Sequence, residues 1–508
     1  MQAILKAPAS MSSTVSLTVP ATATNAVLAP GDFVGFGFET AFVNDYANDF
    51  SNKLMNSVAK RLPETLTIRT GGTSGDMLTY DPGQAAVKVC VSGDCPIGSS
   101  AAYILGPAYF DGFASFQDFH LSVQAPLGPT VNLSNTLAYV ELALDQVGDR
   151  LAAIAIGNEP NLYPAEFGVS YSIEQYVADV ELVRANLTDA LGLNETIFEL
   201  LDISDFAETD STTKFTIINT FERGIDSTDN AKFAATHFYQ IKTETSTLAQ
   251  MQTDLMNHAV IVSNISAGVP QDVAYLAANY PAVQYIFSET GSGLTTPREI
   301  QDSFGAALWF VDFQLYSLVS GVARVDGTQR PAANHSLWVP DDSAGDVNPG
   351  PQVRAPFYAQ PFVADFIGLA PGNVLEIDLA SDYLVAYASY NASTGAAEKL
   401  ALINFIAWAD GISTASRGSV SFAVSASGLR DTVRVRRLRA EAGCQAMGYD
   451  YAGPEQNITW AGEQWSYSLD GGEGHLVANV NVSEVVDVTD GQFTVQVLDS
   501  EAILVDLI

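Results

Sequence analysis

The chain has 508 residues, of which 23 are basic and 58 acidic, giving a formal net charge of −35 at pH 7. This charge repels nucleic acid, anionic membranes and sulfated polysaccharides, so we expect no polyanionic partner. Hydrophobic residues make up 47% of the chain and charged residues 16%, which excludes a disordered protein and indicates a packed, acidic globular one. The length exceeds what one hydrophobic core supports and predicts a large domain with a smaller one.

Eight strand-like runs alternate with helix-length segments between about residues 33 and 330. The runs are FVGFGFET (33–40), TLTIRTGG (65–72), HLSVQAPL (120–127), LAAIAIGNEP (151–160), FELLDIS (198–204), KFAATHFYQ (232–240), VQYIFSETG (283–291) and GVARVDG (321–327). This pattern is typical of a (β/α)8 TIM barrel, an α/β fold, and fits an open doubly wound sheet less well. No Gly-x-Gly-x-x-Gly phosphate loop follows any run, and we expect neither a cofactor nor a metal.

The pattern changes after about residue 355, where short runs alternate apolar and polar residues between Gly, Asp and Asn. This alternation predicts a C-terminal antiparallel β-sandwich. The N-terminal run TVSLTVP (14–20) alternates in the same way and is expected to add a strand to that sandwich. We therefore assign residues 27–350 to the barrel, and residues 1–26 plus 351–508 to the sandwich. The apolar segment 304–325 has Asp312 and Gln314 near its middle, which favours a buried helix over a membrane span.

Asn-x-Ser/Thr sequons favour a secreted, extracellular, N-glycosylated protein, because chance at this composition gives only about three or four. The sequons begin at Asn132, Asn186, Asn194, Asn264, Asn334, Asn391, Asn457 and Asn481. Cys90 and Cys95 flank VSGD and are close enough for a local disulfide, although all three cysteines, including Cys444, could be ordinary thiols. The segment 1–21 lacks a basic region followed by a sustained apolar run, so secretion is inferred rather than read from a signal.

Two of the predicted barrel strands end on a glutamate. AIAIGNEP delivers Asn158 and Glu159 at the end of the fourth strand, and YIFSETG delivers Glu289 at the end of the seventh. Active sites of this fold lie at the C-terminal ends of the strands, so both carboxyl groups are expected in one cleft. Such a pair suggests glycoside hydrolysis, and a retaining mechanism needs the two about 5 to 5.5 Å apart. The alternative is that either glutamate caps a helix or pairs with an arginine at the rim.

These motifs, with GFGFET on the first strand, IRTGGTSGD on the second, THFYQ on the sixth and a β-sandwich shared by both termini, resemble glycoside hydrolase family 79. That family holds β-glucuronidases and heparanases. The resemblance implies that Glu159 is the acid/base, that Glu289 is the nucleophile and that Asn158 hydrogen-bonds the sugar 2-OH. Tyr239 would steady the nucleophile, its alternative being a core tyrosine, and Glu39 would bind sugar hydroxyls.

Other residues near the predicted site have a structural alternative as well as a functional one. Arg69 and Asp76 are expected to pair and shape the floor of the site, as a structural ion pair or in direct contact with substrate, and His237 could equally be a satisfied core histidine. For a uronate carboxylate, the segment TGSGLTT offers backbone amides at Gly291, Ser292 and Gly293. Members of the family are similar in using amides of this loop and tyrosine hydroxyls rather than an arginine. His335 and Tyr316 are further candidates.

The resemblance implies a retaining, exo-acting β-glucuronidase that releases terminal glucuronic acid, or its 4-O-methyl form, from glycans or glucuronide conjugates. The net charge of −35 predicts an acidic pH optimum, because part of the negative charge around a bound uronate must be neutralised. We expect a monomer with a carbohydrate substrate and without nucleic acid or membrane partners. The alternatives are another retaining β-glycosidase (a β-glucosidase, a β-xylosidase or a heparanase-like endo-enzyme) and an inactive carbohydrate-binding protein. RVRRLR (434–439) is the longest basic cluster that could hold a sulfated chain, and it alternates like a strand.

Overall fold

The computed structural model describes residues 14–93, 101–193, 196–207, 211–241, 248–294, 297–342, 350–413, 415–453 and 457–507. Eight parallel strands close into a barrel, and each overlaps one of the eight runs expected from the sequence. They are β3 (Val34–Phe38), β4 (Thr67–Thr70), β8 (His120–Ala125), β9 (Leu151–Ile156), β10 (Phe198–Ile203), β11 (Ala231–Ile241), β12 (Gln284–Gly293) and β13 (Arg324–Gln329). The predicted barrel is thus confirmed.

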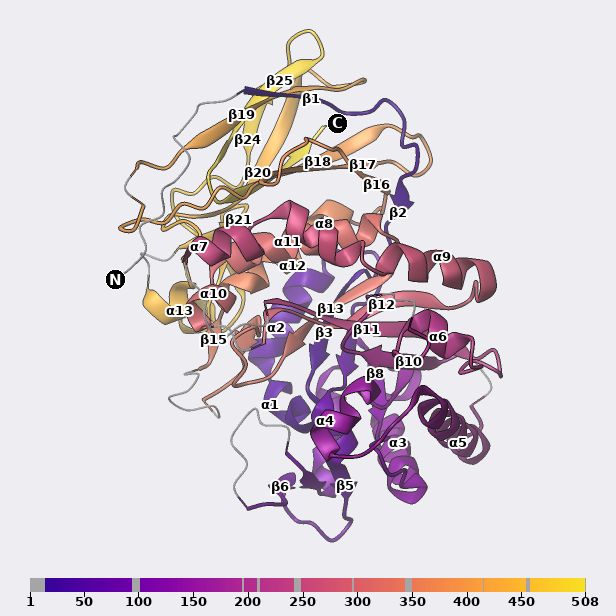
Figure 1. Cartoon of the computed structure of the whole chain (residues 1–508). Coiled ribbons are helices and arrows are strands. Elements are labelled where there is room, and N and C mark those ends of the chain that lie inside the picture. The colour runs from indigo at the N-terminus through magenta and orange to yellow at the C-terminus, as the bar shows by residue number, and fades with distance from the viewer. Residues whose placement is uncertain are drawn as a thin grey trace.

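Helices follow the strands and cover the barrel (Figure 1). The longer ones are α2 (Asp49–Ala59), α3 (Leu133–Val147), α5 (Ile173–Leu191), α8 (His258–Ile265), α9 (Val269–Asn279) and α11 (Phe304–Val319). Asn48, Asn132 and Ser172 begin three of them by accepting a hydrogen bond from the backbone N–H three residues later. Short helices α1 (Val43–Tyr46), α4 (Tyr163–Phe167), α6 (Ile217–Phe221), α7 (Leu248–Gln250) and α10 (Arg298–Gln301) lie in the connections.

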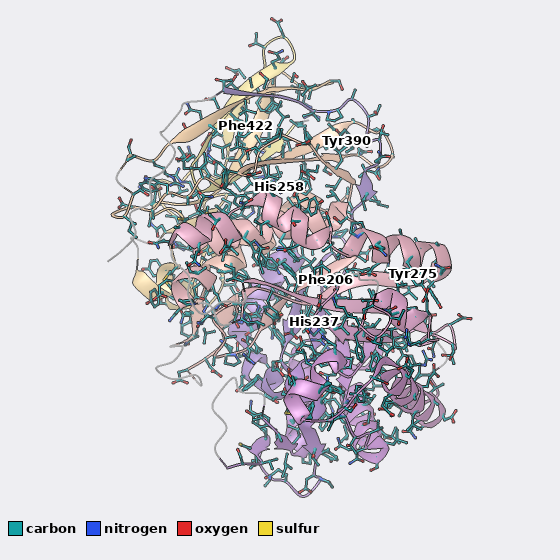
Figure 2. The ribbon with its side chains drawn as sticks, in the orientation of Figure 1. Phe206, His237, His258, Tyr275, Tyr390 and Phe422 are labelled. Atoms are coloured by element: carbon teal, nitrogen blue, oxygen red, sulfur yellow. The ribbon has the colours of Figure 1, made fainter. Side chains whose placement is uncertain are left out.

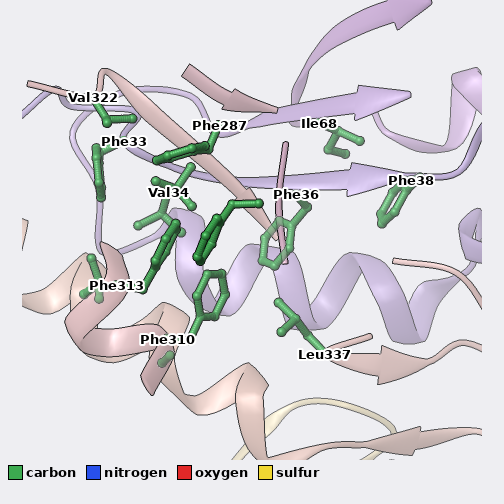
Figure 3. Close-up of a cluster of buried hydrophobic side chains, with 14 of the residues drawn as sticks. Phe33, Val34, Phe36, Phe38, Ile68, Phe287, Phe310, Phe313, Val322 and Leu337 are labelled. Carbon is green, nitrogen blue, oxygen red and sulfur yellow. The ribbon is translucent and has the colours of Figure 1, made fainter. Parts of the chain in front are cut away.

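Helix α11 is buried almost throughout, which explains its continuous apolar sequence. Figure 3 shows Phe310 and Phe313 of this helix pointing toward Val34 and Phe36 of β3. Phe313 also lies 5.3 Å from Phe287 of β12, measured between ring centroids. Among the described residues, no helix is long and apolar enough to cross a membrane.

The C-terminal region forms two sheets that pack face to face, as predicted. The smaller sheet has the order β1 (Thr14–Thr18), β19 (Ser419–Ser425), β25 (Gln492–Leu498). The larger one contains β2 (Val27–Leu28), β16 (Asn373–Glu376), β17 (Leu384–Tyr390), β18 (Ala397–Asn404), β26 (Glu501–Asp506), β20 (Thr432–Ala440), β21 (Ile458–Trp460), β22 (Glu463–Trp465) and β23 (Gly474–Leu476), with β24 (Glu484–Asp487) beside β20. A separate apolar core, including Phe422 and Leu402, fills the space between the sheets.

The N-terminal strand joins the sandwich as expected, because β1 pairs in parallel with β19. The expected domain boundaries differ in detail from the pairing. Val27–Leu28 form β2, which pairs with β16 of the larger sheet, and α12 (Ala359–Ile367) packs on α2 and α11 of the barrel. Apolar side chains of α12 such as Phe362 and Phe366 are fully buried there. Helix α12 therefore packs on the barrel, although it follows the barrel in sequence, because the barrel helices cover its apolar face.

Two small sheets were not expected from the sequence. β5 (Leu78–Tyr80), β7 (Tyr103–Leu105) and β6 (Lys88–Cys90) form one beside the barrel, and β14 (Trp338–Val339) pairs with β15 (Gln352–Val353). Short helices α13 (Tyr449–Ala452) and α14 (Tyr467–Asp470) lie in loops of the C-terminal part. Cys90 is disulfide-bonded, but its expected partner Cys95 lies outside the described residues; Cys444 is a buried free thiol.

Candidate active site

A pocket of about 370 Å³ opens at the C-terminal ends of the barrel strands and contains both predicted glutamates. Glu159 follows β9 and Glu289 lies within β12, and their side chains are 12% and 13% exposed. The residues lining the pocket are Glu39, Thr73, Glu159, Leu162, Glu166, Ser204, Tyr239, Glu289, Leu294, Thr328, Arg330 and His335. The volume is at the small end of the roughly 300 to 1,000 Å³ that ligand sites span.

His237, which is labelled in Figure 2, lies on β11, and its imidazole contacts both carboxyl groups. Its Nδ1 is 3.0 Å from Oε1 of Glu159 and 3.7 Å from Oε2 of Glu289. These two oxygens cannot be farther apart than the sum of the two distances. This bound, which holds for these two oxygens, is compatible with the separation of about 5 to 5.5 Å that a retaining pair needs.

His237 carries a positive charge. Burial disfavours the imidazolium, but the charge of Glu289 and hydrogen bonds to Asp202 and Glu159 raise the pKa of His237 to about 10. The sequence left open whether this residue is a core histidine, and the structure places it in contact with both carboxyl groups.

Glu289 is held in its ionised form. The Tyr239 hydroxyl donates a hydrogen bond to Oε1 of Glu289, and Nη1 of Arg69 donates to Oε2 at 3.3 Å. Burial opposes ionisation, but the charges of His237 and Arg69 and the Tyr239 hydrogen bond lower the pKa of Glu289 below its usual value. A carboxylate of this kind is suited to act as a nucleophile.

Glu159 sits on a constrained backbone. Its φ is 47°, in the left-handed region that few non-glycine residues adopt. Its N–H donates to the carbonyl of Asp202, at 2.8 Å, and Asp202 has a φ of 44°. The turns after β9 and at the end of β10 therefore hold each other, as is common where strain orients a functional side chain.

Asn158 is oriented from two sides. Its Oδ1 accepts from Nη2 of Arg69 at 3.0 Å, and its N–H donates to Oδ2 of Asp76 at 2.9 Å. Within the described residues, its buried Nδ2 has no hydrogen-bond partner. An unpaired buried donor beside the acid/base candidate fits the expected contact with a sugar hydroxyl.

Charged side chains fill the barrel beneath the pocket, and Glu199, Asp202 and Arg324 among them were not anticipated from the sequence. Arg69 forms ion pairs with Asp202 (2.7 Å), Glu289 (3.3 Å) and Glu199 (3.6 Å). Farther down, Arg324 pairs with Asp326 at 2.9 Å. The run FELLDIS carries two carboxylates, Glu199 and Asp202, in an otherwise apolar stretch, and this was the signal that could have revealed the network.

The expected pairing of Arg69 with Asp76 is wrong. Asp76 instead accepts hydrogen bonds from the Tyr163 hydroxyl (2.6 Å) and from the backbone N–H groups of Asn158 and Leu127. Burial raises the pKa of Asp76 to about 6. Asp76 therefore holds the loop that carries the acid/base candidate, while Arg69 forms ion pairs with the carboxylates inside the barrel.

Glu39 and His335 both line the pocket. Oε1 of Glu39 accepts from the Ser74 N–H at 2.7 Å, and burial raises the pKa of Glu39. Nδ1 of His335 is 3.0 Å from the carbonyl oxygen of Gly293. Burial and the charge of Arg330 lower the pKa of His335 to about 3, so its ring is neutral. The neutral ring donates from Nδ1 to that carbonyl, which leaves Nε2 as an acceptor.

Gly291, Ser292 and Gly293 form the end of strand β12 rather than an open loop, and β12 pairs with β11 up to Gly293. A Cβ atom on Gly291 would lie 2.8 Å from the Tyr239 ring and 3.1 Å from Cβ of His335. The glycine thus permits close packing around the nucleophile candidate. These three residues are not among those that line the pocket, and Leu294 is. Tyr316, also a candidate, lies instead on α11, where its ring faces His258.

Two charged pocket residues were not anticipated, namely Glu166 on α4 and Arg330 after β13. Burial and the charges of Glu159, Asp76, Glu39 and Glu289 raise the pKa of Glu166 to about 7. Both residues lie in connections, where no periodic pattern marks a side chain that points into a site.

Comparisons with known proteins point to one family of glycoside hydrolases. The model of the glycosyl hydrolase family 79 C-terminal beta domain matches residues 386–504. A β-glucuronidase of Aspergillus niger is 27% identical, over 97% of this chain and 93% of its own. A β-glucuronidase of Neurospora crassa is 26% identical, over 88% of this chain and 87% of its own.

Solved structures share the fold. A 4-O-α-L-rhamnosyl-β-D-glucuronidase from Fusarium oxysporum 12S, in complex with Rha-GlcA, superposes with a TM-score of 0.79 at 21% identity, covering 97% of this chain and all of that one. A family 51 arabinofuranosidase from Xanthomonas axonopodis pv. citri gives a TM-score of 0.64 at 12% identity, covering 97% of this chain and 99% of that one. At these identities the likeness establishes the barrel with its sandwich.

Proposed function

The chain belongs to glycoside hydrolase family 79, and on this premise we propose that it is a retaining, exo-acting β-glucuronidase. The observation that carries the mechanism is the sharing of one imidazole by Glu159 and Glu289. The names of the relatives from Aspergillus niger and Neurospora crassa support the glucuronide substrate.

In the first step, Glu289 attacks the anomeric carbon while the bond from that carbon to the leaving oxygen breaks. Glu159 gives its proton to that oxygen, and the aglycone leaves as an alcohol. The negative charge of Glu289 is consumed in the covalent ester. Arg69 and Tyr239 hold the attacking carboxylate in position, and Asn158 is placed to bind the 2-OH.

In the second step, Glu159, now a carboxylate, takes a proton from water, and the water oxygen attacks the same carbon. The ester bond breaks and Glu289 returns as a carboxylate. Two inversions at one carbon return the β-configuration.

The substrate we propose is a terminal β-linked glucuronic acid, plain or 4-O-methylated, on a glycan or a conjugate. The small volume of the pocket supports action on chain ends rather than within chains. The sequons support a secreted, N-glycosylated protein, and we expect a monomer, to be checked by gel filtration before and after enzymatic removal of N-glycans.

Hydrolysis rates on nitrophenyl β-glucuronide, β-glucoside and β-xyloside test the proposal, together with proton NMR of the first product. We expect the glucuronide to be preferred and the β-anomer to form first. Preference for a neutral glycoside would remove the uronate assignment and favour a β-glucosidase or β-xylosidase. First appearance of the α-anomer would overturn double displacement, and no hydrolysis would favour a carbohydrate-binding protein.

A further inference from the structure

Arg330 is the arginine that lines the pocket, and no described residue forms a hydrogen bond or ion pair with its guanidinium. It follows β13 directly, and the N–H of Glu39 donates to the carbonyl of its neighbour Gln329 at 3.1 Å. Arg330 is half-buried. In the described part of the chain, all its hydrogen bonds are made by its backbone, with Ser336 and Ala333.

Arg330 lines the pocket together with Glu39 and His335. Its influence lowers the pKa of both Glu39 and His335, so the guanidinium lies near these two pocket residues. It nevertheless forms no ion pair with Glu39. A half-buried cation beside a carboxylate, yet unpaired, is free to bind a ligand.

The other cations near the pocket are already engaged. Arg69 is 1% exposed and forms three ion pairs, so it cannot turn toward a substrate. His237 bridges the two glutamates. His335 is neutral and presents an acceptor, which repels a carboxylate.

An anionic sugar enters a pocket already lined by four glutamates, Glu39, Glu159, Glu166 and Glu289. Repulsion between like charges in a partly desolvated site costs affinity unless a cation offsets it. Gly291, Ser292 and Gly293 belong to strand β12, which pairs with β11, and none of the three lines the pocket.

We propose that Arg330 binds the carboxylate of the uronic acid and thereby selects glucuronides over neutral β-glycosides. The inference deepens the proposed function and rests on it. A guanidinium can donate two parallel hydrogen bonds to a carboxylate, which an ammonium cannot.

The test compares wild type, Arg330→Gln and Arg330→Lys on nitrophenyl β-glucuronide, its methyl ester and nitrophenyl β-glucoside. We expect Arg330→Gln to lower kcat/KM for the glucuronide about 10- to 100-fold, mainly through KM, because a charge-assisted hydrogen bond is lost. The rates on the ester and the glucoside should change less than about threefold, and Arg330→Lys should fall between the two enzymes on the glucuronide.

Arg430→Gln is the matched control, because Arg430 is exposed in the sandwich and the same charge is removed there. Equal losses on all three substrates would overturn the inference and mean that Arg330 only offsets the charge of Glu39. An unchanged preference for the glucuronide in Arg330→Gln would overturn it too. A wild type without glucuronidase activity would instead overturn the proposed function, so the two failures are distinguishable. Inhibition by free glucuronic acid, lost in Arg330→Gln, is a binding readout independent of turnover.

Discussion

His237 places one positive charge between two carboxyl groups that have opposite tasks. Glu289 must stay ionised to attack, and the charges of His237 and Arg69 keep the pKa of Glu289 low. Glu159 must deliver a proton and then retrieve one. The contact of Glu159 with the same imidazole, at 3.0 Å, orients the acid whichever proton state it is in.

The effect of replacing Glu159 by Ala on the rate of the first chemical step should depend on the leaving group of the substrate. Phenyl glucuronides, which need protonation of a basic oxygen, should slow by about 10² to 10⁴, whereas 2,4-dinitrophenyl glucuronide should form the covalent ester nearly as fast as in wild type. Pre-steady-state kinetics on both substrates measure this difference.

Azide provides the control for that variant. A small anion can enter the space left by the carboxyl group and attack the covalent ester without base catalysis, so azide should restore turnover of the dinitrophenyl substrate and yield the β-azide. Equal losses on both leaving groups would remove Glu159 from the acid role.

Glu166 should make substrate binding depend on pH. Its pKa is raised to about 7, so the carboxyl is neutral at pH 5 and negative at pH 8, where it repels an anionic sugar. We expect KM for the glucuronide to rise between pH 6 and pH 8 in wild type and to rise less in Glu166→Gln. The neutral glucoside is the control, because its KM should follow the same pH profile in both enzymes. Identical glucuronide profiles would contradict the assignment.

The site residues that could be predicted from the sequence are those that stand directly at the end of a recognisable apolar strand. Glu159 and Glu289 each interrupt an apolar strand, so their place at the mouth of the barrel could be predicted. Arg330 and Glu166 could not, because which way a side chain points from a connection depends on the path of the whole loop. The partners of Arg69 were assigned wrongly because Glu199 and Asp202 come close to it only when the barrel closes.

At the scale of elements, a polar cluster links the barrel to the sandwich. His258, at the start of α8, contacts Oδ2 of Asp312 on α11 and Oε1 of Glu376 on β16, both at 2.9 Å. Tyr387 of β17 donates to Oδ1 of Asp312 at 2.5 Å. Figure 2 shows His258 at the level where the helices meet the sandwich. The two carboxylates raise the pKa of His258 to about 10 despite its burial.

His258→Gln should lower the free energy of unfolding by roughly 3 kcal/mol at pH 7, because it leaves the buried Asp312 without its cation. Urea unfolding followed by fluorescence measures this change. The double variant His258→Gln, Asp312→Asn should recover part of the loss, since position 312 then no longer carries an unpaired buried charge. A single variant as stable as wild type would show that the cluster does not stabilise the junction.

The elements themselves were largely predictable where they are long and regular. All eight barrel strands and the longer strands of the sandwich carry an apolar run or an alternation, as burial on two faces or on one requires. β5, β6 and β7 span three residues each, too few for any period to show. Helix α12 was missed because its residues AQPFVADFI sit at the point where the pattern changes from barrel to sandwich.

For the whole molecule, the buried acids and histidines predict greater stability in acid than in mild alkali. Burial raises the pKa of Glu199 to about 7 and that of Asp326 to about 6. The folded protein therefore holds these protons more tightly than the unfolded chain. That stabilisation is complete below the unfolded pKa of about 4 and is lost as the pH rises to about 7.

His237 and His258 act in the same direction at higher pH. Their pKa values of about 10 stabilise the folded state fully below about 6.5, and the contribution is lost as the pH rises toward 10. The lowered pKa values of Glu289 and Asp202 oppose this trend only below about pH 4. The net charge of −35 adds self-repulsion as the remaining acids ionise.

We therefore expect the midpoint of thermal unfolding to be higher at pH 5 than at pH 8, by calorimetry at constant ionic strength. Repeating the pair of scans in 0.5 M salt is the control, because screening should reduce the surface repulsion and leave the contribution of the buried groups. A midpoint that is higher at pH 8 would contradict the assignment of raised pKa values to the buried groups.

The parallel pairing of β1 with β19 sets an order of events during synthesis. Thr18 and Ser425, whose hydroxyl groups are 3.1 Å apart, are separated by 407 positions in the chain. At roughly 5 to 20 residues per second, the ribosome delivers the partner strand about 20 to 80 s after the first one. All barrel strands have been synthesised before then. The backbone N–H and C=O groups of TVSLT therefore lack their partner strand while about four-fifths of the protein is made. A strand that is synthesised before the whole barrel is thus among the last to reach its place.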